Sequence, residues 1–427
     1  MRRGPMISNA IRSVAMIEPL GDYGIGGYTY ELAEGLVSDG VNVDIYTEPD
    51  YALGNIGLPR RHRLLPALGH FTFRQRELFR QGAKSVAASG PVASAAESKS
   101  RPPLRAGIPL YLRIREKLLP IELAVHMKIS KYDLVWTQWL LPKPYSVAFL
   151  KHCRQLGIRV VHTVHNVLPH EPRPGDMATY GALYRNCDFL IVHSESARDC
   201  LLRTFPKLEA RIIVSSLGLY TMFPRVPGSR SEVRQRLEIR DDQPTLLFYG
   251  GVRPYKNIDA VLEALRAPAL KDAVLIVAGR EMCYEDLVPG KPLGRTRRKA
   301  EQLGISDRVR LIGGTLSLRE TAEIFEAADA VLLPYIESYG SALLLLSMTF
   351  GKYVVATQTG GMDEYLARYP RHVLVDEPIP ASLAEGIRMC IARLASDGKP
   401  CEAPRIPELE WPQIAHDTLR KISASTS

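Results

Sequence analysis

The alternation of strand-like and helix-like runs along almost the whole chain is the feature that most constrains its fold. Short apolar runs end in glycine or polar residues and alternate with longer runs of helical spacing. This pattern predicts parallel βαβ units and an α/β architecture with Rossmann-like domains. In the first half we expect a helix over Gly27–Gly40 and strands over Ser13–Ile17, Val41–Tyr46, Asp133–Trp136, Arg159–Thr163, Phe189–Val192 and Arg211–Val214.

A second series of the same kind follows a break in composition after Leu219. Residues 220–243 are rich in proline and charge, lack a strand pattern, and predict an interdomain linker. Beyond it we expect strands over Leu246–Tyr249, Val274–Ala278, Arg308–Ile312, Ala330–Pro334, Val354–Thr357 and His372–Val375, and helices over Ile258–Leu265, Ala381–Leu394 and Trp411–Ser423. The chain of 427 residues is long enough for two cores. We predict Rossmann-like domains over 1–219 and 244–408, facing each other across a cleft, and a last helix over 409–427 that crosses back to the first domain.

The charge balance limits the class of partner. The formal net charge is +9, which favours nucleotide phosphates, an anionic membrane surface or nucleic acid. No helix-turn-helix or zinc-finger spacing occurs, so we expect no nucleic-acid partner. The six cysteines form no CxxC pair, which argues against a metal site or a disulfide framework and favours reduced thiols in a cytosolic compartment.

Two basic segments, residues 60–80 and 105–128, flank a small, polar, proline-containing stretch at 82–104 that we expect to be a flexible loop. Both segments mix arginine and lysine with leucine and aromatic residues. They fit either peripheral contact with an anionic membrane or surface helices with a basic outer face. We expect no signal peptide and no membrane-spanning segment.

Ligands of open α/β sheets bind beyond the carboxyl ends of the strands. After the expected strand Leu246–Tyr249 come two glycines and then Arg253 and Lys256, just before a helix. Arginine with paired N–H donors and lysine as a point charge can hold a diphosphate. When these two residues are considered alone, they could equally well be surface cations of a loop that bind no ligand.

Two stretches in the first half of the chain are also candidates for ligand binding. Gly24, Gly26 and Gly27 lie between a strand and a helix and could present amides to a phosphate, although the pattern is not GxGxxG. His165 and Asn166 follow another strand, with His162 and His170 nearby. No carboxylate or cysteine sits at ligand spacing, so we expect hydrogen bonding to a polar ligand such as a sugar and no metal. His162, within the strand, is expected to be a satisfied core residue.

The stretch "PYIESYGSALLLLSMTFGKYVVATQTGG" contains the last candidate ligand-binding residues. We expect Leu343–Phe350 to be helical, with mostly core leucines. The amides of Ser341, Ala342 and Leu343 would lie at its N-terminus, where unpaired N–H groups and the helix dipole suit a diphosphate.

Taken together, these motifs resemble the retaining glycosyltransferases of family 4, which have the GT-B fold. "FYGGVRPYKNIDAVLEAL", "ADAVLLPYIES", "SALLLLSMTFGKYVVATQTGGMDEYL" and "WPQIAHDTLRKI" occur in the family's order, with "HTVHNVLPHE" and the Gly26–Gly27 loop in the first half. The resemblance implies transfer of a sugar from a nucleoside diphosphate sugar with retained configuration and without a metal or other cofactor. It implies catalytic roles for His165, Arg253 and Lys256, and donor binding by Gly26, Gly27, Arg253, Lys256, Glu337, Ser341, Ala342 and Leu343.

The chain departs from the family at four positions where the family often has a charged or polar residue. Anchored on Gly360–Gly361, the family's two glutamates fall on Ser338 and Leu346, and Glu337 is one residue from the first. A bacterial exopolysaccharide-type branch also lacks this pair, and the chain resembles it. Leu217 and Gly251 stand where a histidine and an arginine are frequent.

The sequence therefore predicts a hexosyltransferase that uses a GDP- or UDP-linked sugar. Its acceptor would be a glycan or polyprenyl-linked acceptor of bacterial surface polysaccharide or glycolipid synthesis. We expect it in the cytoplasm, in peripheral contact with the inner face of the membrane. One alternative is a non-catalytic subunit that binds sugar nucleotide or a sister transferase. Another is a GT-B-like epimerase, for which no cleft carboxylates can be placed.

Overall fold

The computed structural model describes residues 11–19, 24–47, 63–65, 107–140, 143–169, 172–226, 228–280, 292–397 and 405–425. In the long helix α3 (Gly107–Ile129) it describes the side chains from Leu118 onward. The expected loop at 82–104 and most of the basic segment 60–80 lie outside the described residues, as does His170.

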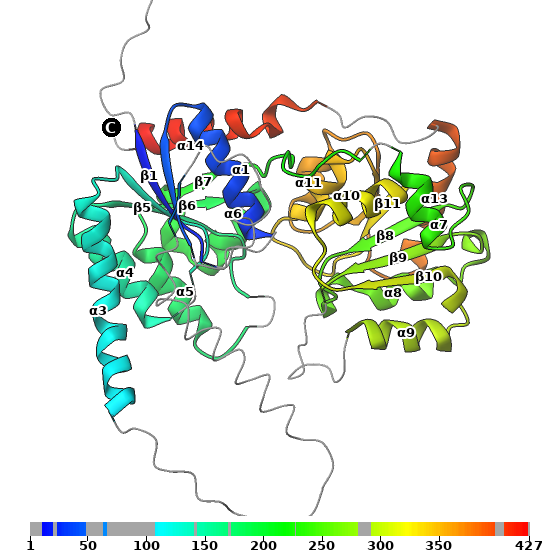
Figure 1. Ribbon diagram of the computed structural model, residues 1–427, viewed down its shortest axis with the longest axis horizontal. Coiled ribbons are helices and arrows are strands. Elements are labelled where there is room, and N and C mark those ends of the chain that lie inside the picture. The colour runs from blue at the N-terminus through cyan, green and yellow to red at the C-terminus, as the bar shows by residue number, and fades with distance from the viewer. Residues whose placement is uncertain are drawn as a thin grey trace, which may run out of the picture.

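The N-terminal domain is built on a seven-stranded parallel sheet (Figure 1). Its strand order is β3-β2-β1-β4-β5-β6-β7. The central strands are almost wholly buried, as expected for a parallel sheet covered on both faces. The strands are β1 (Ser13–Ile17), β2 (Asn42–Tyr46), β3 (Arg63–Leu65), β4 (Leu134–Thr137), β5 (Arg159–Thr163), β6 (Phe189–Val192) and β7 (Ile212–Val214).

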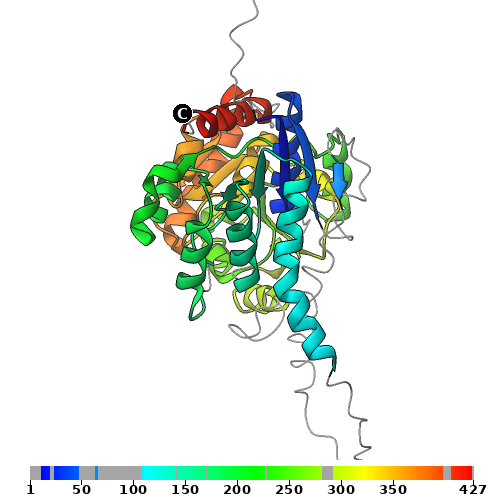
Figure 2. The ribbon, with the colours of Figure 1, turned by 90° about the vertical axis from the view of Figure 1, so that its left-hand side faces the viewer.

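Helices cover both faces of this sheet. One face packs against α1 (Ile25–Ser38) and α14 (Trp411–Ala424), and the other lies under α3 and the helices that follow it. Figure 2 shows α3 continuing past the other elements of the domain. The remaining helices are α4 (Pro144–Gln155), α5 (Asp176–Arg185) and α6 (Glu195–Thr204).

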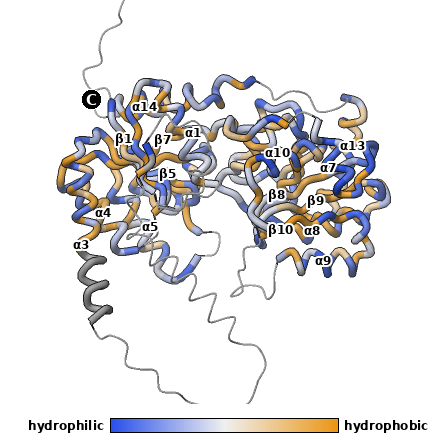
Figure 3. The backbone as a smooth tube through the Cα atoms, in the orientation of Figure 1, coloured by the Kyte–Doolittle hydropathy of each residue, from blue (hydrophilic) through white to orange (hydrophobic). Residues whose placement is uncertain are grey.

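The C-terminal domain repeats the design with a six-stranded parallel sheet of order β10-β9-β8-β11-β12-β13. In Figure 3 hydrophobic residues mark its strands β8 and β9. Its strands are β8 (Thr245–Tyr249), β9 (Val274–Gly279), β10 (Val309–Gly313), β11 (Ala330–Leu333), β12 (Tyr353–Thr357) and β13 (His372–Val375). Its helices are α8 (Ile258–Ala264), α9 (Pro292–Gln302), α10 (Leu318–Ala327), α11 (Ala342–Thr349), α12 (Met362–Leu366) and α13 (Pro380–Asp397). Two parallel α/β sheets confirm the predicted pair of Rossmann-like domains.

The segment 220–243 is not wholly extended, because it contains helix α7 (Ser229–Arg236). This helix packs on α10, and Arg234 within it is fully buried. The Arg234 guanidinium donates to the Ala327 carbonyl at 2.9 Å and to the Asp329 carboxylate at 2.8 Å. A buried arginine needs such partners, so α7 is held firmly to the C-terminal domain.

Helix α14 closes the fold by packing on α1 and β7 of the N-terminal domain. The approach is so close that a Cβ on Gly35 would lie 2.5 Å from the Trp411 carbonyl oxygen. The Trp411 indole N–H donates to the Leu219 carbonyl at 2.7 Å. A single apolar cluster accordingly runs from the α1 face of the first sheet, past Tyr220 and Met222, to one face of the second.

Most expected elements are found within one or two residues of their predicted bounds. The expected start of the first helix at Gly27 is wrong, because α1 begins at Ile25 and has Gly26 and Gly27 in its first turn. Four cysteines among the described residues are unpaired, and three of them (Cys153, Cys187 and Cys390) are buried. None of the described helices has the length and apolar character that a membrane span requires.

Candidate functional site

Lys256 lies directly over the carboxyl end of β8. The chain turns through Gly250 and Gly251 after the strand and reaches Lys256 in a short 3-10 turn before α8. The Lys256 ammonium donates to the Tyr249 carbonyl at 3.3 Å and lies 5.8 Å from the centre of the Tyr335 ring. Gly250 has a φ of +92°, and a Cβ there would come within 2.8 Å of Lys256 Nζ. The positive φ therefore favours glycine at position 250, and a side chain there would displace the Lys256 ammonium from this strand end.

The charge on Lys256 is poorly compensated by the protein. Burial, followed by repulsion from Arg253, lowers the pKa of Lys256 to about 8. Among the described residues no carboxylate lies within ion-pair distance of it. A half-buried ammonium whose partner is a single carbonyl is well suited to receive an anion. Arg253 precedes it on the same turn, as the sequence predicted, and its diphosphate role stays a prediction.

Helix α11 presents its N-terminus at the neighbouring strand end. Its N-cap is Ser341, whose hydroxyl accepts a hydrogen bond from the Leu344 amide at 3.2 Å. The N–H groups of Ala342 and Leu343 begin the helix and have no intrahelical acceptor. Both residues are half-buried, whereas Ser341 is only 5 % exposed. Donor binding at Ser341, Ala342 and Leu343 stays a prediction, and the geometry favours the last two as the amides that a ligand can reach.

The structure shows what occupies the two positions at which the family has glutamates. Leu346, at the second glutamate position, is buried and packs in the core with Leu344 and Leu345. Glu337 is exposed in the loop between β11 and α11, and that loop is tied down by the Ile336 amide, which donates to the Tyr255 carbonyl at 2.8 Å. Donor binding by Glu337 stays a prediction.

The N-terminal domain contributes a cluster of three aromatic rings. Tyr28 on α1 lies 5.0 Å from His165, which follows β5, and 5.1 Å from His193, which follows β6. The two imidazole centres are 5.3 Å apart. The Tyr28 hydroxyl and the Nε2 atoms of both histidines are buried without a hydrogen-bond partner among the described residues. The sequence motifs pointed to His165, and to Gly26 and Gly27, which directly precede Tyr28. They did not point to Tyr28 itself or to His193.

Burial keeps this cluster uncharged. It lowers the pKa of His193 to about 4, and it lowers the pKa of His165 well below its usual value, with His193 and His162 adding to that effect. His162 behaves as expected of a core residue, because its Nδ1 pairs with the Thr137 hydroxyl at 2.8 Å. A cluster of neutral imidazoles with unfilled Nε2 atoms is suited to polar, uncharged groups. The described residues contain no group of three or more His, Cys, Asp or Glu side chains that could hold a metal ion.

The two halves of the site meet at His193. A Cβ on Gly340, just before α11, would lie 3.9 Å from the His193 Cβ. The Tyr365 hydroxyl on α12 donates to the His193 carbonyl at 2.5 Å and accepts from the Leu217 amide at 2.9 Å. Beside it, the Glu364 carboxylate accepts from the amides that begin α6. The polar cluster of Tyr28, His165 and His193 therefore lies where the N-terminal domain approaches the start of helix α11.

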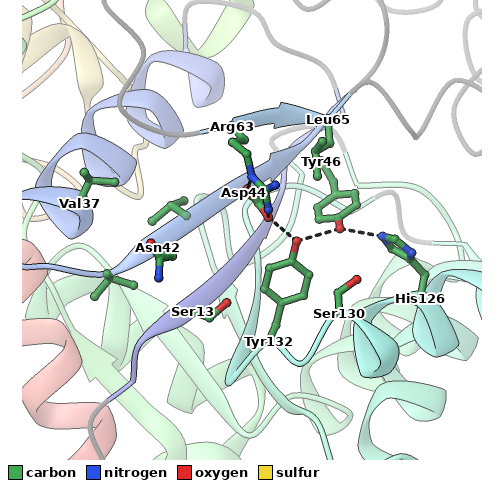
Figure 4. Close-up of a pocket in the computed structure, with 12 residues that line it drawn as sticks. Ser13, Val37, Asn42, Asp44, Tyr46, Arg63, Leu65, His126, Ser130 and Tyr132 are labelled. Atoms are coloured by element: carbon green, nitrogen blue, oxygen red, sulfur yellow. Dashed lines mark hydrogen bonds and ion pairs between the residues drawn. The ribbon is translucent and has the colours of Figure 1, made fainter.

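A large hollow lies elsewhere, at the β3 side of the first sheet (Figure 4). Its volume is about 600 Å³. Asp44 accepts from Arg63 and from the Tyr132 hydroxyl, Tyr132 contacts the Tyr46 hydroxyl at 3.0 Å, and Tyr46 contacts His126 at 2.8 Å. These polar groups satisfy one another, and none of the predicted site residues lines the hollow.

Comparison with known proteins decides the family. Residues 229–395 match the model of "Glycosyl transferases group 1", and residues 23–218 match the "Glycosyl transferase 4-like domain". The chain belongs to the glycosyltransferases of GT-B fold. The two matched ranges meet near α7, in agreement with the packing of that helix on the C-terminal domain.

Relatives of this glycosyltransferase include two proteins named D-inositol 3-phosphate glycosyltransferase. That of Geodermatophilus obscurus is 33% identical over 180 residues, which are 39% of this chain and 37% of the relative. That of Acidothermus cellulolyticus is 25% identical over 383 residues, which are 85% and 77% of the two chains. The first four curated relatives are matched over 37% to 66% of their own length.

A solved structure supports the fold assignment. The UDP complex of Anabaena HepE superimposes with a TM-score of 0.63 at 16% identity, over 97% of this chain and 99% of the other. At this identity the likeness establishes the GT-B fold and no more.

Proposed function

We propose that this glycosyltransferase transfers a hexosyl group from a UDP- or GDP-linked sugar to a glycan or polyprenyl-linked acceptor, with retention of configuration. The observation that carries the proposal is Lys256, an under-compensated ammonium at the strand end beside α11. Ligands of open α/β sheets bind at such strand ends. The D-inositol 3-phosphate glycosyltransferase names of relatives support glycosyl transfer, although they name a different acceptor, and the UDP bound to HepE supports a UDP-linked donor.

In the proposed reaction the bond from the sugar C1 to the diphosphate oxygen breaks, and a bond from C1 to the acceptor oxygen forms on the same face. Negative charge grows on the leaving diphosphate, where Lys256, Arg253 and the amides of Ala342 and Leu343 stabilise it. The leaving phosphate oxygen takes the hydroxyl proton. His165 and the Gly26–Gly27 turn contact the sugar. No step in this scheme requires a metal.

Glu337 and Leu346 give a reason to test a second candidate, a non-catalytic subunit that binds sugar nucleotide or a sister transferase. The buried Leu346 cannot make the ribose contact that the family's second glutamate supplies. The transferase and a nucleotide-binding subunit both bind sugar nucleotide, but only the transferase turns it over.

A thermal-shift screen across UDP-, GDP-, TDP- and ADP-sugars, followed by a nucleoside diphosphate release assay, tests the proposal. A bound donor raises the melting temperature by mass action. We expect one donor to stabilise the protein and to be turned over, and Lys256→Ala to lose both effects while Lys256→Arg retains binding. Stabilisation without release would favour the non-catalytic subunit. No stabilisation by any donor would contradict the transferase and the nucleotide-binding subunit, and would leave a subunit that binds only a sister transferase.

We further propose that the chain acts at the inner face of a bacterial membrane, in surface polysaccharide or glycolipid synthesis. Helix α3 exposes a row of apolar side chains at spacings of three and four residues, which places them on one helix face. They are Leu118 (47 % exposed), Ile121 (41 %), Val125 (40 %) and Ile129 (72 %). Lys128 and Lys131 are exposed at the same end of the helix. An apolar face with flanking lysines is typical of helices that lie on anionic lipid.

A further inference from the structure

The adjoining rings of Tyr28, His165 and His193 carry three polar atoms, the Tyr28 hydroxyl and the two Nε2 atoms, that have no partner among the described residues. Tyr28 is 2 % exposed and His193 is 4 % exposed, so bulk water does not satisfy them. The Thr163 hydroxyl is near enough to Tyr28 to act on its pKa but lies outside hydrogen-bonding geometry. Native proteins rarely leave such groups unsatisfied, and three of them on adjoining rings indicate a site for a polar group that comes from outside the protein.

The hydrogen bonding of His193 defines what that group must be. Its Nδ1 lies 3.0 Å from the Ser215 carbonyl oxygen, which can only accept, so Nδ1 carries the proton. Burial keeps the ring neutral. The Nε2 atom of His193 therefore holds a lone pair and requires a donor. A hydroxyl supplies that donor and can also accept from Tyr28.

The position of the cluster indicates where this hydroxyl comes from. His193 lies beside Gly340, the residue that precedes the Ser341 N-cap of α11, because a Cβ added to Gly340 would lie 3.9 Å from the His193 Cβ. In the proposed function the α11 amides hold the diphosphate, and a sugar bound there carries its hydroxyls within a few atoms of the phosphate. The Tyr365 hydroxyl fixes the His193 backbone from the C-terminal domain, so the imidazole is positioned by both domains.

We propose that Tyr28, His165 and His193 form a hydroxyl-binding site between the two domains, in which His193 Nε2 accepts a hydrogen bond from a hydroxyl of a bound sugar. The proposal rests on the proposed function and deepens it, because it adds Tyr28 and His193 to the expected sugar contact of His165. The hydroxyl belongs either to the transferred sugar or to the acceptor sugar, and both have the same chemistry.

Isothermal titration of three variants with UDP and with UDP-glucose tests the site. His193→Asn keeps an amide donor for the Ser215 carbonyl but offers nothing in place of Nε2, and Tyr28→Phe removes one hydroxyl. Tyr220→Phe is the matched control, because the Tyr220 hydroxyl is also buried without a partner but lies outside the three-ring cluster. We expect UDP affinity to stay within twofold in all three. The affinity for UDP-glucose, or for glucose added to the UDP-bound protein, should fall about tenfold in His193→Asn and Tyr28→Phe alone.

Glucose titrated into the UDP-saturated protein separates the two sources of the hydroxyl. A loss confined to UDP-glucose assigns the site to the transferred sugar, and a loss confined to added glucose assigns it to the acceptor sugar. Unchanged affinities in both titrations would mean that the cluster holds only water, and would overturn the inference.

The inference can fail separately from the proposed function. If the wild-type protein binds no UDP, the proposed UDP-linked donor is contradicted. Glucose added alone, followed through the ¹⁵N resonance of His193 Nε2, then still tests the cluster. A shift of that resonance supports a hydroxyl site, and an unchanged resonance at saturating glucose overturns it.

Discussion

The Tyr365 hydroxyl of the C-terminal domain donates a hydrogen bond to the His193 carbonyl of the N-terminal domain at 2.5 Å. The same hydroxyl accepts from the Leu217 amide at 2.9 Å. Glu364, one residue earlier, accepts from the Glu195 and Ser196 amides at 3.0 Å each. A carboxylate at a helix N-terminus is favourable because it satisfies unpaired amides and opposes the helix dipole. Helix α12 thus latches one domain onto the other beside the candidate site.

Tyr365→Phe should loosen this latch. Two buried backbone groups lose their partner, at a cost of about 1–3 kcal/mol each. We expect faster hydrogen exchange of the Leu217 amide and a lower melting temperature. Tyr369→Phe is the control, because the Tyr369 hydroxyl is equally buried but donates to Lys352 within its own domain. Equal exchange at Leu217 in the two variants would show that α12 does not hold the domains together.

The charge state of Lys256 should make donor affinity depend on pH. Burial lowers the pKa of free Lys256 to about 8, and a bound diphosphate raises it again by stabilising the ammonium. Affinity for a UDP-sugar should therefore be constant below pH 8 and fall by up to about tenfold per unit above it. Titration calorimetry between pH 7 and pH 9 measures the slope. Lys256→Arg stays charged throughout and should flatten it, whereas a persistent slope in that variant would remove Lys256 as its source.

Glu31 should make the stability of the protein fall as pH rises. Burial raises the pKa of this carboxyl to about 7, although it accepts from the Thr221 and Met222 amides. Between pH 4.5 and 7 the unfolded chain ionises at this group and the folded chain does not, so stability decreases with pH, by up to about 3 kcal/mol. Urea unfolding across that range measures the effect.

The matched variants for this effect are Glu31→Gln and Glu34→Gln on the same helix. Glu31→Gln should remove the decrease, and Glu34→Gln should preserve most of it, because the Glu34 charge is the smallest of the causes that act on the pKa of Glu31. A decrease of the same size in both variants would locate the titrating group elsewhere.

The α3 face should bind anionic vesicles. The double change Ile121→Ser and Val125→Ser removes two apolar side chains that the fold leaves exposed, so we expect co-sedimentation with phosphatidylglycerol-containing vesicles to fall several-fold with little loss of stability. The control changes are Ile379→Ser and Met389→Ser, which are exposed apolar residues of the C-terminal domain. Binding that is unchanged by the α3 changes, or equal on neutral vesicles, would contradict a membrane role for this helix.

The sequence predicted the parallel strands well where buried β-branched runs made them distinct. Strands β1, β5, β6 and β13 have the predicted bounds to the residue. Strand β3 was missed because three residues at a sheet edge carry no usable period. Helix α3 was not recognised as one element, since Pro120 lies inside it and its polar and apolar residues do not form a single clean face.

The candidate site was predictable only where its signals are local. Lys256 follows a strand and two glycines, and Ala342 begins a helix. Each can therefore be recognised from the residues next to it in the sequence. Tyr28, His193 and Tyr365 come from three elements whose proximity depends on both domains. No spacing in the sequence announces a contact between residues separated by 172 positions.

A crystal structure with a bound UDP-sugar tests the central claim most directly. We predict diphosphate oxygens within hydrogen-bonding distance of the Lys256 ammonium and of the Ala342 or Leu343 amide. A diphosphate held elsewhere, with Lys256 still paired only to the Tyr249 carbonyl, would contradict it.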